Sequence, residues 1–129
     1  MGKRILVVDD EADLTELISF NLREAGYDVE VANDGVKALT AARQTRPNLI
    51  LLDLMLPELD GFAVCEILKR DPKTASIPVI MVTAWTSELS RIIGLSSGAV
   101  DYITKPFSPR EMVNRVNQVL LRHSSAAGA

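Results

Sequence analysis

The sequence predicts an α/β fold, a doubly wound parallel sheet in which five strands alternate with five helices. Short runs rich in β-branched and apolar residues alternate with segments whose apolar residues recur at helical spacing. Three of the runs are almost continuously apolar, which is typical of central strands covered on both faces. Such alternating units connect through right-handed crossovers, so we expect helices on both faces of the sheet.

The predicted strands are short and evenly spaced, and no repeat or low-complexity segment interrupts them. In chain order they are RILVVD (4–9), DVEVA (28–32), NLILLD (48–53), IPVIMVT (77–83) and AVDYIT (99–104).

The first three helices are predicted from apolar spacing and from residues that start or stop a helix. The first stops at Gly26, and the second lies between Asp34, a capping residue, and Pro47. The third, DGFAVCEILKRD, begins after a turn at 57–61 and ends near Pro72. The apolar stripe of the first helix is Leu14, Leu17, Ile18 and Leu22.

The last two helices follow the same logic. The fourth ends before Gly98, and the fifth starts with Ser108 as N-cap, Pro109 at the first helical position and Glu111 completing a capping box. The apolar residues of the fourth are Leu89, Ile92, Ile93 and Leu95, and the buried stripe of the fifth is Met112, Val116, Val119 and Leu120.

The composition limits the classes of function that fit this sequence. The 129 residues fit one domain, and a net charge of −3 from 14 basic and 17 acidic side chains argues against direct nucleic-acid binding by this domain. The single Cys65 forms no internal disulfide, which favours a reducing compartment. The N-terminal apolar stretch is too short for a signal peptide or a membrane span, so we expect a cytoplasmic protein without a membrane partner.

Polar residues end the predicted strands at the sheet edge where ligands gather in this class of fold. Asp9 and Asp10 follow the first strand and Asp53 ends the third, so three carboxylates meet if these strands are neighbours. Thr83 closes the fourth strand and Lys105 follows the fifth. A hydroxyl and an ammonium beside the acids form a complementary cup for a phosphoryl group, because each stabilises developing negative charge.

The acidic cluster predicts a divalent cation and a nucleophile. Crowded carboxylates raise one another's pKa, and Mg²⁺, with Mn²⁺ as the alternative, relieves that repulsion through oxygen ligands. Asp53 is then the candidate nucleophile for an aspartyl phosphate. Taken singly, Asp9 and Asp10 equally fit a helix cap, Asp53 a turn, and Thr83 and Lys105 ordinary strand-end residues. The prediction therefore depends on their conjunction at one edge.

Four motifs carry a resemblance to a known family: ILVVDDE, LILLDLMLPELDGF, VIMVTA and GAVDYITKPFSPRE. With them the sequence resembles, over residues 3–122, the receiver domain of bacterial two-component response regulators. The resemblance implies the flavodoxin-like (βα)5 fold, also called CheY-like, with strand order 2-1-3-4-5. It further implies that the protein is not an enzyme in the ordinary sense, because it catalyses only its own phosphorylation and dephosphorylation. The implied phosphoryl donor is a sensor histidine kinase or a phosphotransfer protein.

The resemblance also implies residue roles. Asp53 would be the phosphoacceptor, Lys105 would pair with the phosphoryl group, and the bond between Lys105 and Pro106 would be cis. Thr83 and Tyr102 would form a switch pair, in which the hydroxyl turns inward and the ring follows. The implied Mg²⁺ ligands are Asp10, Asp53, the backbone carbonyl of Met55 and, through water, Asp9.

The segment GAVDYITKPFSPREMVNRV narrows the resemblance to transcription factors such as the phosphate and osmotic regulators. In that branch, activated receivers dimerise through the fourth helix, fifth strand and fifth helix. Val113 lies off the buried stripe of its helix, which favours an interface, although single exposed apolar residues are common. Carried over by position, the dimer contacts are Arg91 with Glu111, Asp101 with Arg115, and a patch of Ile92, Leu95 and Val113.

Three positions bear on what the resemblance implies. Val100 stands where the family usually has Asp, so Arg122 lacks its acidic partner and we expect a weaker or altered dimer. Met55 and Trp85 flank the phosphorylation site at positions that influence hydrolysis in the family. A bulky Trp85 is a hypothesis for slow dephosphorylation, with a plain exposed aromatic or a partner surface as equal alternatives.

Other functions fit less well. A haloacid-dehalogenase-type phosphatase needs a second Asp as general acid where this chain has Met55. A nucleotide-binding enzyme needs a glycine-rich loop after the first strand, where DDEADL has no glycine. A phosphorylation-independent interaction module remains open, although this sequence keeps every acid and the lysine.

The predicted receiver domain spans 3–123, and residues 124–129 are expected to form a flexible tail or the start of a linker. The chain is then either part of a longer regulator that controls transcription through an absent effector domain, or a stand-alone receiver that acts by protein–protein interaction.

Overall fold

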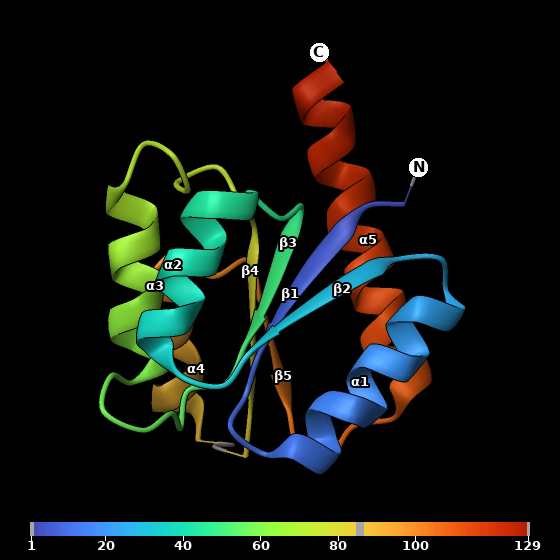
Figure 1. Cartoon of the computed structure of the whole chain (residues 1–129). Helices are drawn as coiled ribbons and strands as arrows, with labels where there is room; N and C mark the ends of the chain where they lie inside the picture. The colour runs from blue at the N-terminus through green and yellow to red at the C-terminus, as the bar shows by residue number, and fades with distance from the viewer. Residues whose placement is uncertain (1, 85–86, 129) are drawn as a thin grey trace.

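The computed structural model describes residues 2–84 and 87–128, with side chains described through His123. Five parallel strands form one sheet in the order β2-β1-β3-β4-β5, which confirms the expected topology (Figure 1). The elements are β1 (Arg4–Val8), α1 (Ala12–Glu24), β2 (Asp28–Ala32), α2 (Gly35–Thr45), β3 (Leu49–Leu52), α3 (Gly61–Arg70), β4 (Val79–Thr83), α4 (Glu88–Ser96), β5 (Asp101–Thr104) and α5 (Pro109–Gly128).

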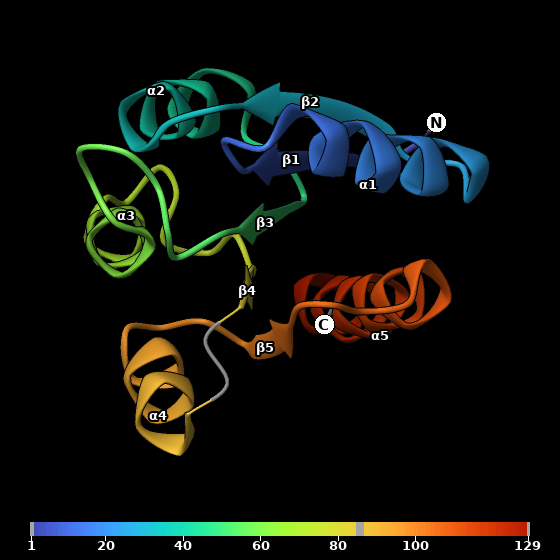
Figure 2. The same ribbon diagram turned by 90° about the horizontal axis from the view of Figure 1, so that it is seen from below.

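The helices cover both faces of the sheet. Figure 2 shows α1 and α5 on one face and α2, α3 and α4 on the other. Each face carries its own apolar core, because side chains of the central strands alternate between the two sides. The predicted stripe of α5 is fully confirmed as buried: Met112, Val116, Val119 and Leu120.

Helix boundaries follow local chemistry. The Asp34 carboxylate accepts from the Lys37 N–H at 2.7 Å and caps α2 as predicted. The Ser108 hydroxyl accepts from the Glu111 N–H at 2.9 Å and caps α5. Gly26 follows α1 with φ +97°, a left-handed conformation that glycine adopts without steric cost.

Helices α4 and α5 differ from what their apolar spacing and composition predict. Gly94 is the one buried residue of α4, whose residues are all described, while Leu89 is 67% exposed. Helix α5 continues to Gly128, through residues expected to form a tail or the start of a linker, and projects beyond the rest of the domain (Figure 1). Across the described residues, no helix has the length and apolar character needed to span a membrane.

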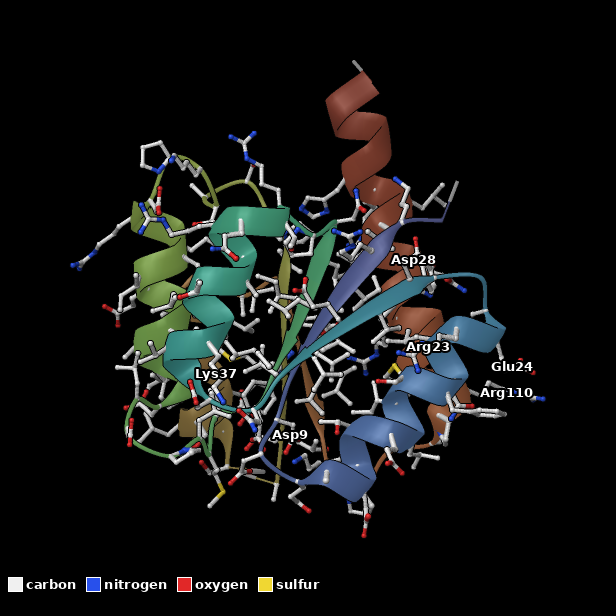
Figure 3. All side chains as sticks on the ribbon, viewed as in Figure 1. Asp9, Arg23, Glu24, Asp28, Lys37 and Arg110 are labelled. Carbon is white, nitrogen blue, oxygen red and sulfur yellow. The ribbon has the colours of Figure 1, made fainter. Side chains whose placement is uncertain are left out.

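The carboxyl ends of the strands lie along one edge of the sheet, and their amino ends lie along the opposite edge. In Figure 3, Asp9 lies at the edge where β1 ends, whereas Asp28, the first residue of β2, lies toward the opposite edge. Because all five strands are parallel, every loop that follows a strand meets at the Asp9 edge.

Candidate functional site

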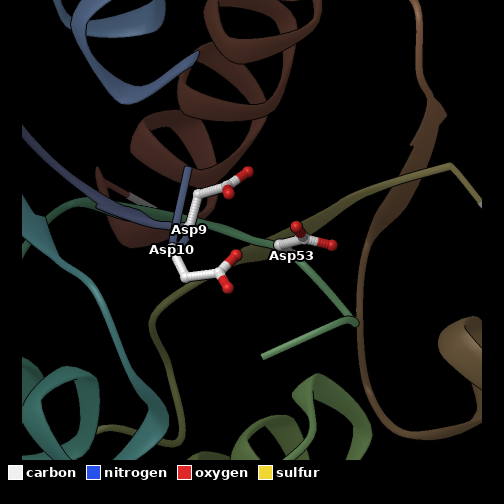
Figure 4. A group of neighbouring side chains, drawn as sticks. All are labelled: Asp9, Asp10 and Asp53. Atoms are coloured by element: carbon white, nitrogen blue, oxygen red, sulfur yellow. The ribbon is translucent and has the colours of Figure 1, made fainter. Parts of the chain in front are cut away.

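Three carboxylates meet at the carboxyl edge of the sheet, side by side and extending in the same direction (Figure 4). One oxygen from each of Asp9, Asp10 and Asp53 lies within 4.8 Å of the others. The parallel register explains this, because Val8 of β1 is paired with Leu52 of β3 and the acids follow directly. The predicted meeting of these side chains is therefore present.

Lys105 bridges two of these acids. Its Nζ donates to Oδ2 of Asp9 at 3.0 Å and to Oδ2 of Asp53 at 2.9 Å. Oε1 of Glu11 lies 3.5 Å from the same nitrogen. Glu11 had no role in the sequence analysis, and its only local signal is its position next to a pair of acids.

Backbone donors hold the remaining oxygens of the two buried acids. Oδ1 of Asp9 accepts from the Glu11 N–H at 2.9 Å, and Oδ1 of Asp53 accepts from the Met55 N–H at 3.0 Å. Asp9 and Asp53 are 3% and 4% exposed, whereas Asp10 is exposed, so the cluster opens to solvent on the Asp10 side.

Burial and charge act against each other on these groups. Burial raises the pKa of the Asp53 carboxyl, and the nearby Asp9 charge adds to the increase, while hydrogen bonds from Met55 and Lys105 oppose it. For Lys105, burial alone would lower the pKa, but the hydrogen bonds and charges of Asp53 and Asp9 outweigh it and raise the pKa. Lys105 is therefore a firmly protonated cation.

The donor set fits a hard divalent cation. The three clustered carboxylates have one ammonium among them, that of Lys105, which pairs with Asp9 and Asp53, so negative charge remains in excess. Oxygen donors at this spacing suit Mg²⁺, which keeps several water ligands, and the exposed Asp10 side leaves room for them.

Thr83 and Tyr102 lie on the two strands next to this cluster. Thr83 ends β4 and is fully buried, and its carbonyl accepts from the Lys105 N–H at 2.7 Å. Tyr102 is 6% exposed, and its ring packs beside Gly94 of α4. The peptide bond between Lys105 and Pro106 is cis, the isomer that the family resemblance implies.

The charged residues expected at a dimer interface make contacts within this chain. Nη1 of Arg115 donates to Oδ1 of Asp101 at 2.8 Å. Arg91 lies 3.8 Å from Glu88, one turn earlier on α4. Asp101 and Arg115, which were expected to pair across a dimer interface, are therefore paired with each other within one chain.

The expected apolar patch is only partly exposed. Ile92 is 51% exposed, whereas Leu95 and Val113 are half-buried, and Val113 packs against the core beneath α1 and α5. Val100 is 39% exposed. Trp85, the candidate for slowing dephosphorylation, lies outside the described residues.

Fold and site together place the chain among the signalling domains of two-component systems. It belongs to the response regulator receiver domain family, whose model matches residues 5–117. Receiver domains generally bind Mg²⁺ in an acidic pocket and work with histidine kinases, so the Asp cluster lies where the family's metal site is expected.

The relatives include transcriptional regulators. The DNA-binding dual master transcriptional regulator RpaA of Synechocystis is 52% identical over 119 residues, covering 92% of this chain and 49% of that protein. The DNA-binding response regulator MtrA of Mycobacterium tuberculosis is 50% identical over 123 residues, covering 95% of this chain and 53% of that protein. The chain thus spans about half the length of the curated relatives it matches.

Solved structures agree with the fold. The receiver domain of the Francisella response regulator 1452 is 37% identical and superposes with a TM-score of 0.88, covering 94% of this chain and 98% of that chain. The similarity therefore extends over nearly the whole of both domains.

Proposed function

We propose that Asp53 accepts a phosphoryl group from the phosphohistidine of a sensor histidine kinase or a phosphotransfer protein. The observation that carries this proposal is the bridge from Lys105 to Asp9 and Asp53 at 3.0 and 2.9 Å, beside the exposed Asp10. A carboxylate that can act as a nucleophile, a cation and an exposed carboxylate that can bind a metal ion therefore lie close together, which supports the proposal.

In the proposed reaction, a carboxylate oxygen of Asp53 attacks phosphorus while the bond from phosphorus to the donor imidazole nitrogen breaks. The imidazole leaves with the electron pair and takes up a proton from water, and an acyl phosphate remains on Asp53. The Lys105 ammonium shifts to donate a hydrogen bond to a phosphoryl oxygen, and the Met55 N–H and Thr83 hydroxyl supply further hydrogen-bond donors.

The residues that would hold Mg²⁺ are Asp10, Asp53 and the Met55 carbonyl, with Asp9 acting through water. A bound Mg²⁺ neutralises carboxylate charge and polarises phosphoryl oxygens. Without it, the excess negative charge of the cluster repels an incoming phosphoryl donor.

Phosphorylation would act as a switch. The added charge draws Thr83 and Lys105 toward Asp53, and Tyr102 and the α4 face rearrange. The face formed by α4, β5 and α5 would then dimerise or bind a partner. Because relatives such as RpaA and MtrA are named as DNA-binding regulators, we propose that the whole protein controls transcription.

Incubation with acetyl phosphate and Mg²⁺ tests the chemistry. Intact-mass spectrometry should find one added phosphoryl group that hydroxylamine removes, as expected of an acyl phosphate. The Asp53→Asn variant and a sample with EDTA should show no adduct, while Asp28→Asn, at the other edge of the sheet, should behave as the wild type. An unmodified wild type would favour the phosphorylation-independent interaction module.

Analytical ultracentrifugation with beryllofluoride, a phosphoryl mimic, tests the dimer. We expect association that is weakened by Ile92→Glu on the exposed face of α4. A domain that stays monomeric at high micromolar concentration would reject the dimer and leave the partner-binding role.

A further inference from the structure

Gly94 occupies a position on α4 where any side chain would meet the Tyr102 ring. A Cβ atom built at this position lies 3.0 Å from Cδ2 and 3.1 Å from Cε2 of Tyr102, and 3.7 Å from Cγ of Met81. Carbon atoms in favourable contact are 3.5 to 4.0 Å apart. Even one methyl group therefore requires a small shift, and a branched side chain requires the ring or the helix to move.

The strand register places this contact on the path from the phosphorylation site. Met81 of β4 pairs with Tyr102 of β5, and Thr83 and Thr104 form a pair two residues later. Because side chains alternate along a strand, Met81, Thr83 and Tyr102 project to the same face of the sheet. That face is the one α4 covers (Figure 2). The Tyr102 ring belongs to the core on this face and lies against Gly94 of the helix.

Helix α4 is held to the rest of the domain near its carboxyl end, and Gly94 in its last turn contacts the Tyr102 ring. After its last turn, the Cys65 thiol donates to the Ser97 carbonyl at 3.4 Å, and a Cβ on Gly98 would lie 2.7 Å from Cγ of Lys69. Gly94, three residues before Ser97, is the single buried α4 residue. A glycine within a helix weakens it relative to alanine, so this position trades helix stability for space.

We infer that Gly94 is a positioning residue for the switch: by lacking a side chain it provides the space in which the Tyr102 ring lies inward. The residue at position 94 therefore sets the balance between inward and outward ring orientations. Through α4 it also sets the state of the proposed output face, which is the face formed by α4, β5 and α5. The inference rests on the proposed function, because it assigns the Tyr102 ring to the switch.

The test follows the ring directly in protein labelled with 3-fluorotyrosine. The chain has two tyrosines, and a Tyr27→Phe background leaves Tyr102 as the single reporter. In the wild type, the ¹⁹F resonance should resist broadening by a soluble gadolinium chelate. In Gly94→Val, the unphosphorylated protein should lose this protection, and beryllofluoride with Mg²⁺ should not restore it. Ser96→Val, which adds the same side chain at an exposed position of α4, should keep the protection.

A double-mutant cycle keeps the inference testable if Gly94→Val folds poorly. Removing the ring with Tyr102→Ala should rescue Gly94→Val, so that the double variant is more stable in urea than the sum of the single effects predicts. Additive effects, or a ring that stays protected in Gly94→Val, would overturn the inference. The mass assay on Asp53 separates the two claims, because a missing adduct in the wild type rejects the phosphorylation while leaving the ring measurement intact.

Discussion

Replacing Asp10 with Asn is expected to stabilise the metal-free protein and to destabilise it relative to wild type in saturating Mg²⁺. The substitution keeps the shape of the side chain and removes one of three crowded negative charges. Asp10 is the appropriate target because it is exposed, whereas Asp9 and Asp53 each pair with Lys105. An effect on stability that changes sign when Mg²⁺ is added is a stringent test of a metal site.

The magnitude follows from the spacing of the carboxylates. Two unit charges at the 4.8 Å limit of the cluster repel by about 3.5 kcal/mol at an effective dielectric constant of about 20. Because Asp10 faces solvent, screening reduces this toward the value of surface pairs, so we expect Asp10→Asn to gain about 1 kcal/mol without metal. Mg²⁺ at a hundredfold excess over its dissociation constant should stabilise the wild type by about 2.7 kcal/mol.

Urea unfolding followed by circular dichroism measures both effects, once in EDTA and once in Mg²⁺, with sodium chloride matching the ionic strength. Asp28→Asn is the control, since it removes the same charge at the opposite edge of the sheet (Figure 3). The reasoning is refuted if Asp10→Asn destabilises the metal-free protein, or if Mg²⁺ stabilises that variant as much as the wild type.

Three further predictions concern stability and reactivity. Ser19→Ala should raise the free energy of unfolding by about 1 kcal/mol, because its buried hydroxyl has no hydrogen-bond partner among the described residues; a loss in urea unfolding would contradict this. Asp34→Ala should lower it by about 1 kcal/mol through loss of the α2 cap, while Asp34→Asn keeps most of the stability. Burial raises the pKa of the Cys65 thiol from 9.0 to about 11, so the folded protein favours the protonated thiol and stability should fall as the pH rises above about 9. At pH 8, an aromatic disulfide reagent should modify Cys65 only as fast as the protein opens; rapid labelling of the native state would refute this burial.

Much of the fold and site follows from local patterns. The run of apolar residues that ends in Asp9, and the similar run that ends in Asp53, predict buried parallel strands with acids at one edge. Strand pairing then turns residues distant in sequence into neighbours, which is why the acidic cluster and Lys105 could be anticipated together. The Asp34 cap could be predicted because capping involves residues only three positions apart in the chain.

Other features depend on tertiary packing that spacing does not encode. Periodicity indicates that α4 is a helix, but its apolar residues are largely exposed and a glycine makes the buried contact. The family resemblance implied an ion pair of Asp101 with Arg115 across a dimer. In this structure the two side chains pair within one chain, because β5 and α5 bring them together. The helical backbone of residues 124–128 was not expected from their small side chains, whereas their role as a tail or the start of a linker stays a prediction.

The two sides of the proposed output face are connected through one carboxylate oxygen. Oδ1 of Asp101 accepts both from the Tyr102 N–H and from Nη1 of Arg115, each at 2.8 Å. Any movement of the Tyr102 backbone on phosphorylation therefore changes the acceptor that holds Arg115 on α5. Because Arg115 is already paired inside the chain, an ion pair across a dimer gains only the difference between two similar contacts. The driving force for the proposed dimer must then come chiefly from apolar residues such as Ile92, which α4 exposes on the side away from Gly94.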